Sequence, residues 1–290
     1  MSLRGDWLLH KAKRDHLKSS VAASFARPSR QGDELAPDKF PDSSRVSVQQ
    51  LTNSRLVTLV PKTETDRHVV LFHGGAYRVR GFDSHRDWMV YLADQLQLKV
   101  TYIDFPLSPE FTVETTVPET LVAYDQLVAQ FPTDRFAFLG DSAGGGLALV
   151  ILQQLRDRQQ PLPVGTVLVS PWADLEMSDT ELARREVNDP ELPLTVMQHV
   201  AAEYAGQLPL DHPWVSPVFG DLQQLGRIGL FYGTTELLVP DYDQLFAELR
   251  EAEGTTVEVF ALKNMMHDYL LWLNLPESKR TFSYLQALFE

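Results

Sequence analysis

The sequence predicts an α/β protein in which a mostly parallel central sheet is covered by helices on both faces. Six short runs of β-branched and apolar residues, starting near positions 68, 98, 134, 165, 227 and 255, have the composition of strands buried on both faces. Segments with helical periodicity separate most of these runs, at about 84–97, 115–130, 143–157 and 241–253. Strands that alternate with helices along the chain are typical of a parallel sheet between two helical layers.

The segment before these strands has a different character. Residues 3–19 show a moderate amphipathic-helix pattern, and residues 24–44 are rich in Pro, Ser, Gly and Asp, which indicates an extended connection. Polar and apolar residues then alternate on both sides of Asn53-Ser54, which predicts a β-hairpin.

A long insertion interrupts the alternation of strands and helices. More than fifty residues without a clear strand lie between positions 172 and 227, and two stretches within them have helical character. Loops of this length without structure of their own are uncommon. We therefore expect the insertion to form part of a cap over a site.

Composition and charge exclude several classes of protein. The chain has 290 residues, of which 44% are hydrophobic and 22% charged, as in ordinary globular proteins. Its formal net charge of −13 disfavours nucleic acid and anionic membranes as partners. There is no cysteine, so disulfides, thiolate catalysis and cysteine-bound zinc are excluded. No apolar run has the length of a membrane span or signal segment, and we expect a cytoplasmic location.

The most informative stretch is "FLGDSAGGGLAL", where a strand-like run passes into a cluster of glycines around Ser142. Residues 140–144 fit the pattern G-x-S-x-G, with a strand before it and a helix after it, which is the setting of a serine nucleophile on a sharp turn. The N-terminus of the following helix favours negative charge that develops near the serine. The alternative is a glycine-rich junction between strand and helix with an incidental serine.

A serine nucleophile requires an oxyanion site, and the chain offers one. Gly74 and Gly75 follow the strand that ends in "LFHGG", where a loop of this kind can turn backbone N–H groups toward a substrate oxygen. With the N–H of Ala143, which follows the serine, they are the predicted donors. We expect His73 to brace the loop and not to transfer protons.

Chain order selects the base and the acid. In proteins of this layout the serine is followed by an acid and then by a histidine, and His267 lies in the loop after the last predicted strand. Glu236 lies just beyond the strand "RIGLFYG" and is the predicted acid. Asp241 is the alternative acid, but its place after Pro240 is also typical of a residue that caps a helix or adds charge to its first turn.

Together these motifs resemble the hormone-sensitive-lipase-like esterase branch of the α/β-hydrolase superfamily. "HGGAY" resembles its oxyanion motif, "GDSAGG" its nucleophile motif and "NMMHDY" its histidine loop, and the similarity covers about residues 68–275. The resemblance implies an α/β-hydrolase fold as a single domain over residues 1–290. It also implies a helical cap formed by about residues 1–40 and the insertion at about 175–215, and ester hydrolysis without a metal or cofactor.

The chain departs from the family pattern at three places. Ala76 replaces a third glycine in the oxyanion loop, and Glu236 stands where the family commonly has aspartate. In "DFPLSPE", which resembles the family's D-Y-R-L-A-P-E segment, Phe105-Pro106 replaces the usual Tyr-Arg. None of these changes removes a catalytic group.

We therefore expect a carboxylesterase whose partner is a small-molecule ester, and which acts on soluble, uncharged, short-chain acyl esters. Two other enzyme classes use the same triad, namely amidases or deacetylases and acyltransferases. A catalytically silent hydrolase fold used for binding would be expected to lack a triad member, and none is missing here. No residue pattern indicates an oligomeric state.

Overall fold

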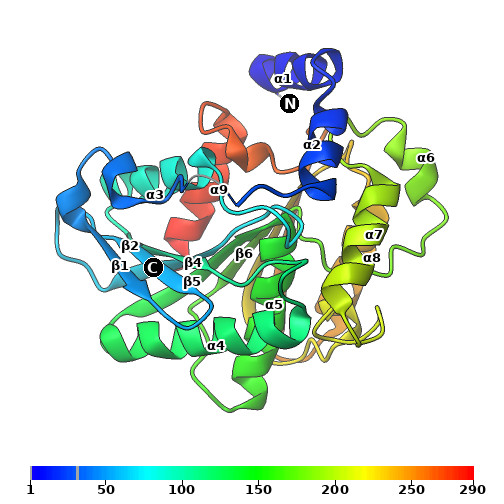
Figure 1. Cartoon of the computed structure of the whole chain (residues 1–290). Coiled ribbons are helices and arrows are strands. Elements are labelled where there is room, and N and C mark those ends of the chain that lie inside the picture. Colours follow the sequence, from blue (N-terminus) through cyan, green and yellow to red (C-terminus); the bar gives the residue numbers. More distant parts are fainter. Residues whose placement is uncertain (1, 31–32) are drawn as a thin grey trace.

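The computed structural model describes residues 2–30 and 33–290, and in this part of the chain eight strands form one sheet (Figure 1). The strands are β1 (Val46–Gln50), β2 (Arg55–Leu59), β3 (Arg67–Phe72), β4 (Lys99–Asp104), β5 (Arg135–Asp141), β6 (Thr166–Val169), β7 (Gly226–Gly233) and β8 (Thr255–Leu262). Their order across the sheet is β1-β2-β4-β3-β5-β6-β7-β8.

Most of the sheet is parallel. The strands from β4 through β3 and β5 to β8 run in the same direction, whereas β2 is antiparallel to both β1 and β4. The β1–β2 pair is the hairpin predicted around Asn53-Ser54, with Gln50 opposite Arg55. The mostly parallel sheet predicted from the sequence is confirmed.

Helices cover both faces of the sheet. On one face lie α3 (Asp83–Gln95) and α9 (Pro276–Ala287), and on the other lie α4 (Val113–Gln130), α5 (Ser142–Asp157) and α8 (Val239–Glu251). Alternate residues of a strand enter the two layers, so that in β3 Val69 joins the core with α3 and α9, while Val70 joins the core with α4 and α5. This arrangement agrees with the α/β-hydrolase fold that the resemblance implies.

The N-terminal segment differs from the prediction of one helix over residues 3–19. It forms two helices, α1 (Leu3–Arg14) and α2 (Leu17–Ala26), separated at His16, whose φ of 55° lies in the left-handed region through which an α-helix does not continue. The predicted extended connection therefore begins too early, because Ser24 to Ala26 belong to α2 and Phe25 is buried in the core.

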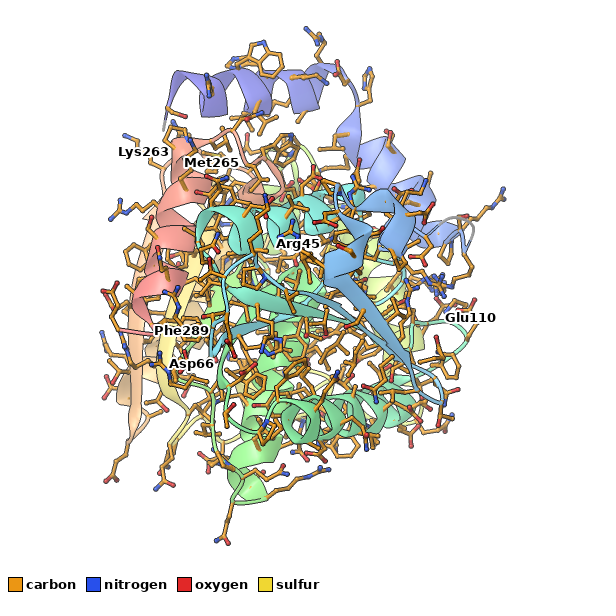
Figure 2. The ribbon with its side chains drawn as sticks, turned by 90° about the vertical axis from the view of Figure 1, so that its left-hand side faces the viewer. Arg45, Asp66, Glu110, Lys263, Met265 and Phe289 are labelled. Atoms are coloured by element: carbon orange, nitrogen blue, oxygen red, sulfur yellow. The ribbon has the colours of Figure 1, made fainter. Side chains whose placement is uncertain are left out.

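The insertion contains α6 (Leu182–Glu186) and α7 (Leu194–Ala205), as the two helical stretches predicted. Helix α7 contacts α2, so the N-terminal segment and the insertion meet (Figure 1). In the view of Figure 2, α1 lies across the end of the molecule where Met265 follows β8. Both segments therefore lie at the carboxyl edge of the parallel strands. Four 3₁₀ helices complete the described residues: η1 (Pro37–Lys39), η2 (Ser43–Arg45), η3 (Pro217–Phe219) and η4 (Tyr269–Leu271).

The strand order places a crevice between β3 and β5. The chain leaves β3 for α3 on one face and leaves β5 for α5 on the other, so the loops at their carboxyl ends diverge. Open parallel sheets bind ligands at such a point.

Candidate active site

Three predicted site residues meet at the carboxyl edge of the sheet. Ser142 follows β5, Glu236 follows β7, and His267 follows β8. His267 Nε2 lies 3.0 Å from Ser142 Oγ, and its Nδ1 lies 2.7 Å from Glu236 Oε2. Both distances are within hydrogen-bonding range, so the three side chains form one continuous chain of polar contacts.

The turn at Ser142 depends on glycines. Ser142 has a φ of 48°, in the left-handed region, at the junction of β5 and α5. A Cβ at Gly140 would lie 2.5 Å from the carbonyl oxygen of Gly144, and a Cβ at Gly144 would lie 2.1 Å from that of Phe72. Neither position has room for a side chain, so the glycines are what allow the strand to turn sharply and present the serine.

The three predicted oxyanion donors lie beside the serine turn. A Cβ at Gly74 would lie 2.4 Å from Asp141 Oδ2, and Gly75 has a φ of 108°. Ala143 is the second residue of α5, and the first four N–H groups of a helix have no acceptor within it. Glycine is therefore required at both positions of the loop, and the N–H of Ala143 is available to a ligand.

The oxyanion loop is held from behind by His73. Its Nδ1 donates to the carbonyl oxygen of Gly74 at 2.7 Å, and its ring stacks on Phe105. Burial lowers the pKa of His73 to about 4, so the ring is neutral at pH 7. Both observations fit a bracing role. The following Ala76, which replaces the family's third glycine, has a φ of 53°, a conformation that glycine would adopt with less strain.

Sequence reasoning missed a second histidine at the nucleophile turn. His85, in α3, is fully buried, and its Nε2 lies 3.1 Å from Oδ2 of Asp141, the residue before the serine. Chain order excludes His85 as the base, and no local pattern in α3 indicates that it would reach Asp141. The contact ties the serine turn to the helix on the opposite face.

Glu236 is held by four hydrogen-bond donors. Its Oε1 accepts from Ser170 Oγ at 2.8 Å and from the N–H of Gly233, and its Oε2 accepts from Tyr242 Oη at 2.6 Å as well as from His267. These contacts fix the carboxylate toward the Nδ1 side of the imidazole. Sequence reasoning did not identify Ser170 or Tyr242. The only signal for Ser170 is its place at the carboxyl end of a strand.

Asp241, the alternative acid, lies in helix α8. It is in the first turn of α8, but the N-cap residue is Leu238, so a capping role for Asp241 is wrong. The residue is 5% exposed, and its Oδ2 has no hydrogen-bond partner among the described residues. Burial raises its pKa to about 8, with Asp174 adding to the effect. Asp241 and His267 form no hydrogen bond or ion pair in the described part of the structure.

Acidic neighbours control the charge of His267. Burial lowers its pKa, but the carboxylates of Asp268 and Glu236 more than offset burial and hold the pKa well above the ordinary value. Asp268 Oδ2 lies 3.3 Å from Nε2, the nitrogen that also faces Ser142. The same carboxylates thus stabilise the imidazolium that forms when the ring takes a proton.

Ser142 and His267 open into a cavity of about 380 Å³. Helix α2 supplies one part of its wall, including Val21 and Phe25, and the insertion supplies Leu192 and Met197. Part of the wall thus comes from the two segments that were predicted to form a cap, and the rest comes from the segment after β3 and from residues beyond His267.

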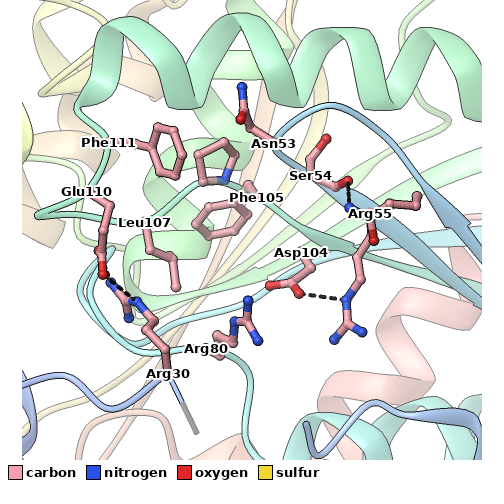
Figure 3. Close-up of a pocket in the computed structure, with 12 residues that line it drawn as sticks. Arg30, Asn53, Ser54, Arg55, Arg80, Asp104, Phe105, Leu107, Glu110 and Phe111 are labelled. Carbon is pink, nitrogen blue, oxygen red and sulfur yellow. Dashed lines mark hydrogen bonds and ion pairs between the residues drawn. The ribbon is translucent and has the colours of Figure 1, made fainter. Parts of the chain in front are cut away.

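A second pocket of about 350 Å³ lies beside the β1–β2 hairpin and the segment after β4 (Figure 3). Four of its charged groups form two pairs, Arg55 with Asp104 and Arg30 with Glu110, and Arg80 also lines it. None of the described residues that line this pocket is a histidine, so Ser54, which also lines it, has no base there.

Comparisons with known proteins agree with this geometry. Residues 69–271 match a family model described as alpha/beta hydrolase fold. The chain belongs to this family. It is 32% identical to an acetyl-hydrolase of Streptomyces hygroscopicus over 223 residues, 76% of this chain and 74% of that protein. It is 27% identical to an esterase of Acinetobacter venetianus over 251 residues, 84% of this chain and 82% of that one.

A solved structure of an esterase from the bacterial hormone-sensitive lipase family aligns with a TM-score of 0.80 and 26% identity, over 97% of this chain and 98% of that one. The resemblance to hormone-sensitive-lipase-like esterases is therefore confirmed, and the chain is a serine ester hydrolase of that branch. Across residues 2–30 and 33–290, no cluster of three or more His, Asp or Glu side chains is placed to hold a metal ion. No helix in the same ranges has the length and apolar character needed to cross a bilayer.

Proposed function

We propose that the protein is a carboxylesterase for short-chain acyl esters, with Ser142 as nucleophile, His267 as base and Glu236 as the acid that orients it. The observation that carries the proposal is the pair of contacts on one imidazole, 3.0 Å to the serine oxygen and 2.7 Å to the carboxylate. A serine at its ordinary pKa is a poor nucleophile, and this arrangement supplies the base that it needs.

In the first half of the reaction, His267 Nε2 takes the proton of Ser142 Oγ while that oxygen attacks the ester carbonyl. Glu236 accepts from Nδ1–H, which fixes the tautomer with a free Nε2 and stabilises the imidazolium. The negative oxygen of the tetrahedral intermediate rests on N–H groups of Gly74, Gly75 and Ala143. When the intermediate collapses, the imidazolium protonates the leaving alcohol.

In the second half, water repeats the sequence on the acyl-enzyme. His267 takes a proton from water as the water oxygen attacks the acyl carbon, and then returns a proton to Ser142 as the carboxylic acid leaves. The serine and the imidazole are restored, so one ester and one water give one alcohol and one acid.

The preference for short acyl chains rests on the cavity. We propose that α2 and the insertion around Leu192 and Met197 form a cap that limits its depth, in line with its volume of about 380 Å³. A cytoplasmic location and the absence of a nucleic-acid partner stay predictions from composition and charge.

Two measurements test the proposal. A fluorophosphonate probe is expected to label Ser142, and Ser142→Ala is expected to abolish labelling and turnover, whereas Ser84→Ala, a change at another serine of the same cavity, keeps both. Labelling that survives Ser142→Ala would place the nucleophile elsewhere. Rates on nitrophenyl esters are expected to fall from acetate and butyrate to longer acyl chains, and faster hydrolysis of emulsified long-chain triglyceride would contradict the short-chain preference.

A further inference from the structure

The cavity around Ser142 contains acidic groups that the proposed reaction does not use. Its lining includes Asp83, Glu191 and Asp268, and no lysine or arginine is among the described residues that line it. Glu191 is 9% exposed and Asp268 is 5% exposed. Glu191 Oε2 and Asp268 Oδ1 are buried without any hydrogen-bond partner in the described structure. Two acidic residues that line a ligand-sized cavity therefore each have one carboxyl oxygen without a donor.

The backbone that presents Glu191 is fixed. Oδ1 of the buried Asp189 accepts from the N–H groups of Glu191 and Leu192 at 2.7 and 2.9 Å, and Oδ2 accepts from that of Leu237 at 2.6 Å. Asp189 thereby ties the insertion to the segment that carries Glu236. The Glu191 carboxyl is held at the cavity before a ligand arrives, which reduces the ordering cost of binding.

A buried carboxyl without a donor is costly, and the free energy is recovered when a donor or cation arrives. Burial raises the pKa of Glu191 to about 8, His267 opposes the rise, and the nearby Asp189 and Glu236 carboxylates add to it. Burial also raises the pKa of Asp268. A cationic group in the cavity would favour ionisation of Glu191 and supply a donor to both side chains.

The position of Asp268 indicates which part of an ester would carry that cation. Its Oδ2 lies 3.3 Å from His267 Nε2, the nitrogen that protonates the leaving alcohol in the proposed mechanism. The ester oxygen of the alcohol must lie within hydrogen-bonding reach of the same nitrogen during the reaction. A group two carbons from that oxygen is then within reach of Asp268.

We propose that the enzyme prefers esters whose alcohol carries an ammonium group two carbons from the ester oxygen, bound by the carboxylates of Asp268 and Glu191. This inference rests on the proposed esterase function. It changes the sequence-based expectation of uncharged substrates, because the two buried acidic groups come together only in the folded chain. The overall negative charge of the protein, −13, also attracts such substrates.

The test compares two esters of nearly equal shape. 2-(Dimethylamino)ethyl butyrate is cationic at pH 7, and 3-methylbutyl butyrate replaces its nitrogen with carbon. We expect kcat/KM, divided for each ester by its rate constant of hydrolysis by hydroxide, to be at least about tenfold higher for the cationic ester, as one charge-assisted hydrogen bond supplies. Similar values for the two esters, or a higher value for the neutral one, would overturn the inference while the esterase proposal stands. If neither ester is hydrolysed, the esterase proposal fails and the inference fails with it.

Variants assign the preference to the two carboxyls. Glu191→Gln and Asp268→Asn are each expected to lower the ratio of the two kcat/KM values by about tenfold, whatever they do to the absolute rates. Glu248→Gln makes the same change on the exposed face of α8 and is expected to leave the ratio unaltered. A ratio that is retained in both pocket variants would refute the assignment. Thermal unfolding checks that each variant folds, and the wild-type ratio tests the preference independently of them.

Discussion

Replacement of Glu236 by glutamine tests the acid of the site, because it removes the charge and keeps the shape. In the structure the carboxylate lies 2.7 Å from His267 Nδ1. Unit charges about 4 Å apart interact by about 4 kcal/mol at an effective dielectric constant of about 20, which is about 10³-fold in rate. The glutamine amide can also donate to Nδ1, which would leave the proton on Nε2, where Asp268 Oδ2 at 3.3 Å can accept it. This tautomer cannot take the serine proton, and we expect kcat to fall by about 10³ to 10⁴-fold.

The assay is steady-state hydrolysis of nitrophenyl acetate, with Asp241→Asn as the matched control. Asp241 forms no hydrogen bond or ion pair with His267 in the described structure, so its variant is expected to keep turnover within about twofold. Urea unfolding checks that Glu236→Gln folds, since the side chain also accepts from Tyr242 and Ser170. A nearly unchanged rate in Glu236→Gln with a large loss in Asp241→Asn would make Asp241 the acid and refute the reasoning.

Three further predictions concern pH, stability and metals. Because the Asp268 and Glu236 carboxylates outweigh burial and hold the pKa of His267 well above its ordinary value, with Glu191 adding to their effect, kcat/KM should rise as pH rises into the alkaline range. Asp268→Asn should shift this rise of kcat/KM to lower pH, and a rise that stays at the same pH would contradict the assigned cause. The pKa of Asp241 is about 8 in the folded chain against 3.8 unfolded, so between these values the folded chain binds more protons and wild-type stability falls as pH rises. In urea unfolding, the free energy of unfolding of Asp241→Asn should therefore rise relative to that of the wild type by up to about 1.4 kcal/mol per pH unit in that window. A difference that stays constant with pH would show that the carboxyl is not held neutral. Activity should survive EDTA, and a loss that a divalent metal restores would contradict the serine mechanism.

The parts of the protein that could be predicted from the sequence are those set by local rules. Strands buried on both faces and the helices between them have distinct compositions, and the structure confirms the resulting fold. Ser142 stands out because its turn requires glycine at 140 and 144, where a Cβ would come within 2.5 Å of backbone oxygens. His267 was selected by chain order, and the structure places it beside Ser142. The break at His16 was missed because the amphipathic pattern of residues 3–19 continues through it.

One residue that could not be predicted, Ser170, depends on strand register, which no local pattern encodes. Ser170 follows β6, and β6 pairs with β7 so that Val169 lies opposite Phe231. The N–H of Ser170 then donates to the carbonyl oxygen of Phe231 at 2.7 Å, which places its hydroxyl 2.8 Å from Glu236, three residues beyond the end of β7. A shift of one residue in this pairing would turn the side chain toward the other face of the sheet. The contact from Ser170 that supports Glu236 thus depends on how β6 and β7 pair, whereas the position of Glu236 depends on where β7 ends.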